Sequence, residues 1–302
     1  MAKRDIYQEI TNKIVNVLDA IDLNDYEAPF AGLAAQGIPL NPTTENAYRG
    51  INIPSLWVDQ QEKQFTSNHW ATFNQWKERG ANVLKGERGS HIIYYKTLTK
   101  TEENEKGEER EHSIPMLKSY TVFNANQVDG YEHDCAVKPN ETDLVKRIKA
   151  ADRFCENTKA DIRSGGIRAF YSRQGDYISM PETIHFVDTK QASATENYYS
   201  TLLHELTHWT GSESRLDRDK AKNKAETDKY AFEELIAELG AAFLCVQIGI
   251  LQTPRDDHAL YIKSWLAALK NDKKLIFKAS AQAAKAVDYL AQLQPNEQSN
   301  QS

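Results

Sequence analysis

A pair of histidines in the run HELTH, at residues 204–208, constrains the fold of this chain more than any other feature. His204 and His208 are four residues apart, so on a helix they lie on one face and both imidazoles can point at one ion. Glu205 is rotated off that line, where it can act on a water molecule instead of the ion. The pattern therefore predicts a divalent-metal site on a helix over about residues 195–210, with zinc as the first choice and other divalent metals as alternatives.

The predicted helix over residues 226–249 supplies candidates for a third metal ligand. Zinc held by two histidines needs one more protein ligand and keeps one open position. Glu234 and Glu238 share a face of this helix within an otherwise apolar run, where carboxylates are costly unless they are paired or bind a cation. One of the two would bind the metal, and the other would hold a ligand histidine by its second ring nitrogen. Glu233 is expected to point away from that face as a solvated charge. A surface helix that carries HExxH by chance is the alternative to the whole site.

These residues predict metal-assisted hydrolysis of a peptide bond. Glu205 would take a proton from water and later pass it to the leaving amine. Tyr230, one helical turn before Glu234, could donate its hydroxyl to a tetrahedral oxyanion, with an ordinary packing tyrosine as the alternative. His133 and His185 are candidate ligands by residue type, but no spacing links either of them to the pair of histidines.

The length and composition of the chain limit the class of protein. A chain of 302 residues is longer than one hydrophobic core usually serves, so we expect two domains. The net charge of -6 means that any nucleic-acid surface must be a local patch. Three cysteines form no CxxC pair, the N-terminus lacks an apolar signal segment, and no run approaches the roughly 20 apolar residues of a membrane span. These features predict a cytoplasmic protein without a membrane partner.

Hydrophobic periodicity divides the chain into two halves, which together predict the α+β class. In the first half we expect helices over 5–20 and 68–79, paired strands over 91–98 and 116–124, and between the strands a solvated acidic loop from Glu102 to Glu111. In the second half we expect a helix over 143–155, a hairpin of strands over 169–172 and 176–180, an extended segment over 181–187, and helices over 195–210, 226–249, 255–270 and 273–293. These elements predict a first domain at 1–130, a linker at 131–142, a mostly helical second domain at 143–294 and a polar tail at 295–302.

The first half carries a basic segment with interleaved aromatic residues. Over residues 76–100 there are six basic and two acidic residues, although the chain is acidic overall. Basic groups that follow phosphates, beside aromatic rings that stack on bases, are what sequence-tolerant binding of single-stranded DNA requires. The alternative is that these aromatic residues belong to the core, and we expect about half of them to be buried. The candidate DNA-binding residues are Arg49, Trp76, Lys77, Arg79, Lys85, Arg88, Tyr94 and Lys96.

Two stretches of the sequence resemble known families. The run NPTTENAYRGIN, followed by WATFNQWKERGANVLKGERGSHIIYYK, is similar to the N-terminal domain shared by ArdC antirestriction proteins and some plasmid primases. The run YYSTLLHELTHWTGSESRLDR, with EELIAELGAAFL after it, is similar to the zincin domain that follows in ArdC. In zincin metallopeptidases with the pattern HExxH…ExxxE/D, the first carboxylate binds zinc and the second supports a histidine. The resemblance therefore implies Glu234 as the ligand and Glu238 as the supporting residue.

The resemblance also implies a function. It implies an α+β domain that binds single-stranded DNA, with double-stranded DNA as an alternative partner, a zincin-like metallopeptidase domain, and protection of incoming conjugative plasmid DNA from host restriction. In one interpretation the DNA-binding half brings a zinc peptidase to a protein of the restriction machinery. In the other, the protein masks DNA or occupies that machinery, and the metal only holds the second domain together. Structural zinc is usually closed by four protein ligands, whereas three can be named here, which favours an open, reactive site.

Overall fold

The computed structural model describes residues 5–21, 30–34, 37–103, 109–132, 144–189, 192–218, 226–250 and 258–295. The first half contains α1 (Ile6–Asp19), α2 (Ala31–Ala34), β1 (Leu40–Asn41), β2 (Asn46–Ala47), α3 (Asn52–Glu62), β3 (Trp70–Thr72), α4 (Phe73–Glu78), β4 (Asn82–Val83), β5 (Ser90–Glu103), β6 (Glu109–Asn124) and β7 (Val128–Asp129). The second half contains α5 (Leu144–Asn157), β8 (Asp161–Ser164), β9 (Phe170–Ser172), β10 (Tyr177–Met180), α6 (Ala194–Trp209), α7 (Glu226–Ile248), α8 (His258–Asn271) and α9 (Leu275–Gln292).

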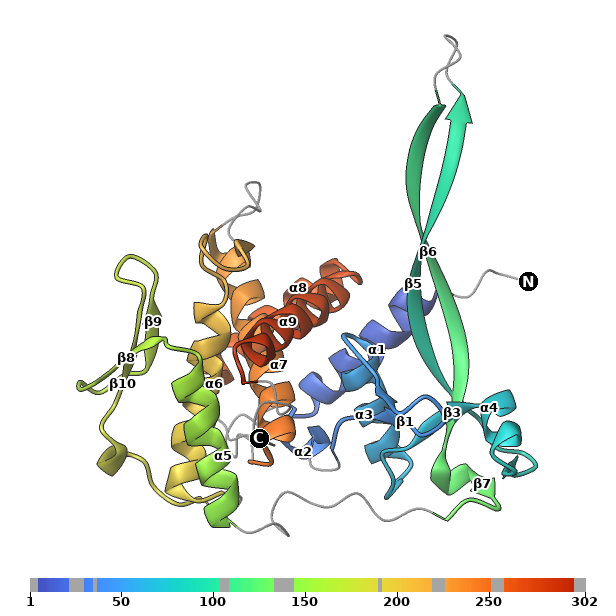
Figure 1. Cartoon of the computed structure of the whole chain (residues 1–302), viewed down its shortest axis with the longest axis horizontal. Coiled ribbons are helices and arrows are strands. Elements are labelled where there is room, and N and C mark those ends of the chain that lie inside the picture. The colour runs from blue at the N-terminus through green and yellow to red at the C-terminus, as the bar shows by residue number, and fades with distance from the viewer. Residues whose placement is uncertain are drawn as a thin grey trace, which may run out of the picture.

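The predicted α+β class is confirmed, with small sheets in the first half and a mostly helical second half (Figure 1). β9 and β10 form the expected antiparallel hairpin, while β8, which the sequence pattern did not indicate, pairs in parallel with the other side of β10. The segment over 181–187 is not extended throughout as expected. It contains a 3₁₀ turn at Thr183–His185, because the N–H of His185 donates to the carbonyl of Glu182 at 2.9 Å.

The helix predicted over 68–79 begins later than expected. Trp70–Thr72 forms β3, since it pairs antiparallel with β6 in a register that sets Trp70 opposite Asn124. α4 then begins at Phe73 under a capping box: the Thr72 hydroxyl accepts from the N–H of Gln75, and the Gln75 side chain accepts from the N–H of Thr72. The apolar spacing of this segment fits a strand followed by a helix as well as one continuous helix, and pairing with a distant strand decides between them.

β5 and β6 form a long antiparallel hairpin that projects from the body of the protein (Figure 1). Their register runs from Ser90 opposite Val122 to Glu103 opposite Glu109. The acidic run from Glu102 to Glu111 was expected to be a loop, and that prediction is wrong for the part of the run that lies in the two strands. Both faces of an isolated two-stranded ribbon can be solvated, so charged residues do not end its strands. Residues 104–108 lie outside the described residues.

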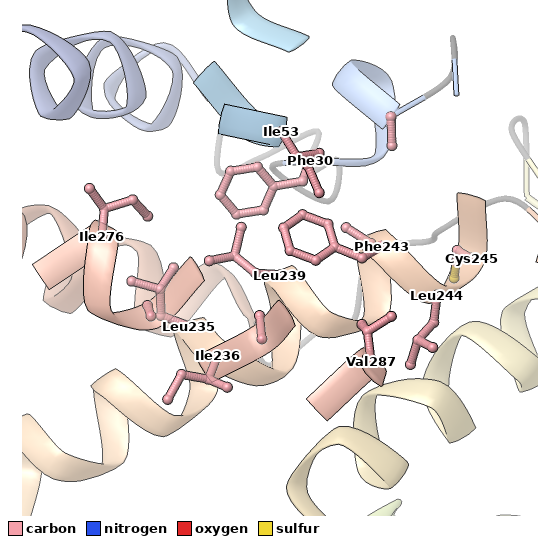
Figure 2. Packing of buried hydrophobic residues seen from close by; sticks show 14 of the residues in the cluster. Phe30, Ile53, Leu235, Ile236, Leu239, Phe243, Leu244, Cys245, Ile276 and Val287 are labelled. Atoms are coloured by element: carbon pink, nitrogen blue, oxygen red, sulfur yellow. The ribbon is translucent and has the colours of Figure 1, made fainter. Parts of the chain in front are cut away.

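The main hydrophobic core is built from both halves of the chain. Figure 2 shows Phe30 and Ile53 of the first half against Leu239 and Phe243 of α7. Trp57 of α3 meets Phe243 edge to face, with 5.8 Å between the ring centroids. Two smaller clusters lie within the first half. α7 is therefore held against residues of both halves, which fixes the position of the carboxylates that it carries.

The predicted linker lies largely in a part of the chain that is not described. Residues 133–143 are outside the described residues, so the boundary at 131–142 stays a prediction, as does the polar tail, of which residue 295 alone is described. Among the helices within the described ranges, none is long and apolar enough to cross a membrane.

Candidate functional site

α6 carries the two predicted histidines within the core, as expected from the sequence. Ser193 caps the helix: its hydroxyl accepts from the N–H of Glu196, whose carboxylate accepts from the N–H of Ser193 in return. Leu203 and its apolar neighbours fix the helix in the main core. His204 and Glu205 are each only 2% exposed. A polar side chain as deeply buried as that of His204 needs partners, and the next helix supplies carboxylates to it.

α7 lies close enough to α6 to bring its carboxylates to the histidines. Gly240 permits this approach, because a Cβ at that position would lie 2.5 Å from Cγ2 of Thr207 on α6. α7 is also held by Trp265 of α8, whose indole N–H donates to the carbonyl of Ala231 at 2.9 Å. Gly240 thus allows the short distance between α6 and α7 that the site needs, and the indole fixes α7 to α8.

Three donor atoms from α6 and α7 converge on one point. Nε2 of His204 lies 3.1 Å from Nε2 of His208, and the two carboxylate oxygens of Glu234 lie 3.4 Å from them, Oε2 from the nitrogen of His204 and Oε1 from that of His208. Ligands at about 2.0–2.1 Å from a tetrahedral zinc ion are separated by about 3.3 Å. His204, His208 and Glu234 thus form a group consistent with the pattern HExxH…E, and their spacing fits a metal ion.

Two further carboxylates lie against the outer ring nitrogens of these histidines. Oε2 of Glu238 is 3.6 Å from Nδ1 of His204, slightly longer than a hydrogen bond. Oε1 of Glu233 is 3.3 Å from Nδ1 of His208. The expectation that Glu233 points away as a solvated charge is wrong, because Arg218 holds its carboxylate at this site. The Arg218 guanidinium donates to both carboxylate oxygens of Glu233, at 2.5 and 3.1 Å.

Arg218 was not recognised from the sequence, although it is central to the arrangement. It lies after α6, and its side chain is almost fully buried. Its guanidinium also donates to the hydroxyl of Thr210 and to the carbonyl of Thr207, both at 2.6 Å. It therefore ties the last turn of α6 to Glu233 on α7. No local pattern indicates this, because the contact depends on how the chain turns back after the helix.

The buried charges make the site attractive to a cation. Burial favours the neutral form of His208, but contacts with Glu233 and Glu234 outweigh it and raise the pKa of His208 to about 10. Burial opposes ionisation of Glu233, yet His208 and Arg218 lower its pKa to about 2. Burial also opposes ionisation of Glu234, and the two histidines hold its pKa well below the usual range. The carboxylates stay ionised, so a metal ion competes with protons for the same nitrogens.

The other residues predicted for the metal site differ in their placement. Glu205 is buried on α6, and its charge helps to raise the pKa of His208. Tyr230 is on α7 one turn before Glu234 and is half exposed, so its hydroxyl role stays a prediction. His185 is an exposed residue of the 3₁₀ turn and does not belong to the metal group, while His133 lies outside the described residues.

A second arginine fixes the small sheet to the end of α6, which carries His204 and His208 and is called the metal helix below. Arg215 forms an ion pair with Asp176, which is in the turn between β9 and β10. Its guanidinium also lies 3.9 Å from the ring centroid of Trp209, the last residue of α6. Tyr171 on β9 donates its hydroxyl to Asp176 at 2.8 Å. This cluster places the β9–β10 hairpin beside the metal helix, and the sequence patterns did not indicate it.

The candidate DNA-binding residues fall into distinct environments. Trp76 is completely buried, and its indole N–H donates to the carbonyl of Phe123 at 2.9 Å. It belongs to a small core of the first half, so it cannot stack on a base. For this residue the alternative interpretation, burial in the core, is the correct one. Arg49 is exposed and paired with Asp288 of α9, and Arg79 donates to the carbonyl of Pro42.

The remaining candidates leave charge or ring surface open to solvent. Lys77, Lys85 and Arg88 are exposed, and the side chain of Tyr94 is 60% exposed. The side chain of Lys96 lies outside the described residues, although its backbone belongs to β5. The exposed residues lie around α4, the turn before β5, and the hairpin itself.

Two protein-family models match the chain, one in each half. A model described as the N-terminal domain of the anti-restriction factor ArdC matches residues 4–123. A model described as a zincin-like metallopeptidase matches residues 149–282. The second match covers both helices that form the metal group.

Solved structures and curated proteins resemble the chain over nearly its full length. The metal-free crystal structure of the antirestriction protein ArdC from plasmid R388 is 42% identical, with a TM-score of 0.77, and the alignment covers 96% of this chain and 98% of that one. The Mn(II)-bound structure is 41% identical with a TM-score of 0.74, covering 97% and 100%. The uncharacterized protein y4eC of Sinorhizobium fredii is 36% identical over 98% of this chain and 95% of its own length. The DNA primase TraC of Escherichia coli is 35% identical, but this chain spans only 27% of it.

Proposed function

Because this chain belongs to the ArdC antirestriction family, we propose that it binds single-stranded DNA through its first half, hydrolyses a peptide bond at the metal group of its second half, and so protects incoming plasmid DNA from host restriction. The observation that carries the enzymatic part is the convergence of His204, His208 and Glu234 beside the buried Glu205. Glu205 follows the ligand His204 directly on α6 and is buried with it, which places a carboxylate that can act as a general base beside the metal group.

We assign zinc to the group formed by His204, His208 and Glu234. Two imidazoles and one carboxylate are a ligand set of catalytic zinc sites, and the donor spacing of 3.1–3.4 Å fits that ion. When bound, the cation supplies a Lewis acid that polarises the scissile carbonyl and acidifies a water molecule. Manganese is the alternative ion, since the R388 relative has a Mn(II)-bound structure.

Other residues of the site would transfer protons, stabilise the oxyanion and orient the metal ligands. Glu205 accepts a proton from the attacking water and returns it to the leaving amine. Tyr230 is exposed one turn before the ligand Glu234 and would donate its hydroxyl to the oxyanion. Glu233 and Glu238 orient the imidazoles through their outer nitrogens.

The DNA-binding part of the proposal is supported by exposed basic residues of the first half. Lys77, Lys85 and Arg88 are all open to solvent within or beside the basic segment. Phosphate contacts by such residues make affinity fall as salt rises, with little dependence on base sequence. The protein that would be cut is one associated with the bound DNA, such as a component of the restriction machinery.

The second candidate function is a binding protein that masks DNA or occupies the restriction machinery without cutting anything. The metal would then stabilise the second half alone. In the described residues the metal group contains three ligands, whereas a closed structural zinc site usually contains four. This observation favours the enzyme.

A restriction-protection assay in cells with Glu205→Gln tests the choice between the two functions. The variant keeps all three ligands and removes the base, which typically costs 10²–10⁴-fold in rate. We expect metal content and DNA affinity to stay near those of the wild type while protection is lost. The matched control combines Lys85→Ala with Arg88→Ala, which weakens DNA binding and leaves the metal group intact. Protection that survives Glu205→Gln but is lost in the lysine–arginine control would establish the binding protein instead.

A further inference from the structure

The β5–β6 hairpin has two faces with different environments. In a strand, alternate side chains point to opposite faces, and residues opposite one another in the register share a face. Tyr94 pairs with Lys118, and Ile92 pairs with Tyr120, so these four side chains stand on one face. We call this set the outer face. Tyr94 is 60% exposed, Tyr120 is 43% exposed and Lys118 is exposed, and the set contains no carboxylate.

The opposite face of the hairpin is turned toward the body of the protein. Ile93 is buried in the main core, and the side chain of Asn52 on α3 covers the backbone of that residue with two hydrogen bonds of 2.9 Å. Tyr95 is half exposed, but its hydroxyl lies 3.2 Å from the hydroxyl of Tyr7 on α1. The inner tyrosine therefore has a partner within the fold, whereas the outer face presents its rings to solvent.

At the base of the hairpin, the outer face lies beside the aromatic ring of Phe65 and the ammonium group of Lys63. Phe65 and Ile92 pack against the same small cluster of the first half. The Lys63 ammonium lies 5.6 Å from the centroid of the Phe65 ring, and it donates to the carbonyl of Arg88 at 3.0 Å. Over the described side chains from Lys63 to Tyr94 and Lys118, the surface thus combines basic groups with apolar and aromatic ones.

The spacing of the two outer tyrosines suits an unpaired base. Tyr94 and Tyr120 are diagonal neighbours across the two strands, so their side chains originate about 7 Å apart. Side chains stand roughly perpendicular to a sheet, so the two rings rise from the surface beside one another. Stacked aromatic planes lie about 3.4 Å apart, as in DNA itself, so the gap between two such rings takes one base. A paired base in a duplex could not enter it.

We propose that the outer face of the β5–β6 hairpin is the surface on which the protein holds single-stranded DNA, with bases stacked on Tyr94 and Tyr120 and phosphates beside Lys118 and Lys63. The inference rests on the proposed DNA-binding function and specifies the residues that carry it. A nucleic acid is the occupant that fits, because exposed rings alternate with positive charge and no carboxylate lies among the four side chains of the face. Tyr120, Lys118 and Lys63 are outside the set that the sequence indicated.

The test measures binding of the full-length protein to a fluorescent thymidine oligonucleotide longer than the roughly 4–16 nucleotides that such surfaces occupy. A second oligonucleotide of the same length lacks bases and keeps the phosphates. The variants are Tyr94→Ala with Tyr120→Ala, the conservative pair Tyr94→Phe with Tyr120→Phe, and Lys118→Ala. Tyr95→Ala is the matched control, because it removes a half-exposed tyrosine from the opposite face of the same strand.

The alanine pair is expected to weaken binding of the thymidine strand at least 30-fold, since each ring contributes on the order of 5- to 150-fold. It should leave binding of the baseless strand and the salt dependence unchanged. The phenylalanine pair should bind like the wild type, as should the Tyr95 control. Lys118→Ala should lower the slope of log affinity against log salt by about 0.7.

Two results would overturn the inference and leave the DNA-binding function standing. One is an alanine pair that binds the thymidine strand as tightly as the wild type, which would place the bases elsewhere on the protein. The other is an equal loss on both strands, which would mean that the rings do not act through stacking. A wild-type protein that binds neither strand at low salt would overturn both the inference and the proposed DNA binding.

Discussion

The contact between Glu233 and His208 leads to a quantitative prediction, because the carboxylate holds a metal-binding imidazole and is itself held by a buried arginine. Glu233→Gln keeps the shape of the side chain and one oxygen acceptor, but it removes the charge that faces both His208 and Arg218. Loss of a group that orients a ligand histidine typically costs 10–100-fold in metal affinity. Since the amide oxygen can still accept from Nδ1, we expect about tenfold weaker binding, or about 1.4 kcal/mol.

The same change should also lower the stability of the metal-free protein. Arg218 is 3% exposed, and Glu233 is the carboxylate that neutralises it. Removing one partner of a buried pair costs about 3–5 kcal/mol when nothing replaces it. Here Arg218 keeps its hydrogen bonds to Thr210 and Thr207, and the glutamine oxygen can accept from it. We therefore expect a smaller loss, about 1–3 kcal/mol in the free energy of unfolding.

Competition with a zinc-binding dye measures the metal affinity, and urea denaturation in excess chelator measures the stability of the metal-free chain. Glu213→Gln is the matched control, because Glu213 is an exposed carboxylate in the segment between Trp209 and Arg218. It should leave both quantities unchanged. The reasoning fails if Glu233→Gln binds zinc with the wild-type affinity while the free energy of unfolding falls as expected. That result would mean that Glu233 serves the fold through Arg218 and does not orient His208.

Three further predictions concern the metal group and the helices that form it. The purified wild type should contain about one divalent ion per chain by elemental analysis, and His204→Ala with His208→Ala should abolish it; full metal retention would refute the site. Glu234→Ala should weaken metal binding more than Glu238→Ala in a chelator competition, because Glu234 contributes a donor atom and Glu238 only faces a histidine at 3.6 Å. The reverse order would make Glu238 the ligand. Gly240→Ala should cost about 1–3 kcal/mol in the free energy of unfolding, because the added methyl group has no room beside α6, and unchanged stability would show that the helices separate freely.

The metal helix could be predicted from sequence because its signals are local. The spacing of His204 and His208 sets both on one face of any helix, and Ser193 and Glu196 mark the beginning of that helix. Helical periodicity also sets Glu234 on one face of α7, and this face meets the histidines when α6 and α7 pack together. These features depend on residues a few positions apart, so the sequence pattern contains them.

The features that were missed depend on contacts between distant residues. Glu233 is rotated from the ligand face of its helix, so the sequence pattern predicts that it is exposed to solvent. Its pairing with Arg218 depends on the turn of the chain between α6 and α7, which no local pattern indicates. Trp70 fitted a helix until pairing with β6 placed it in a strand. Trp76 looked like a stacking residue because composition does not distinguish a buried indole from an exposed one.

The core that the two halves share has a consequence for how the protein would select what it cuts. If the two halves had separate cores joined by a flexible linker, the metal group could reach any protein within a distance of the first half that is set by the length of the linker. In this chain Phe30 and Ile53 pack on the helix that carries Glu234, so the first half and the metal group keep a set separation and orientation. On the proposed function, a protein is cut according to where it sits along the bound strand, and no particular amino-acid motif is needed to recognise it.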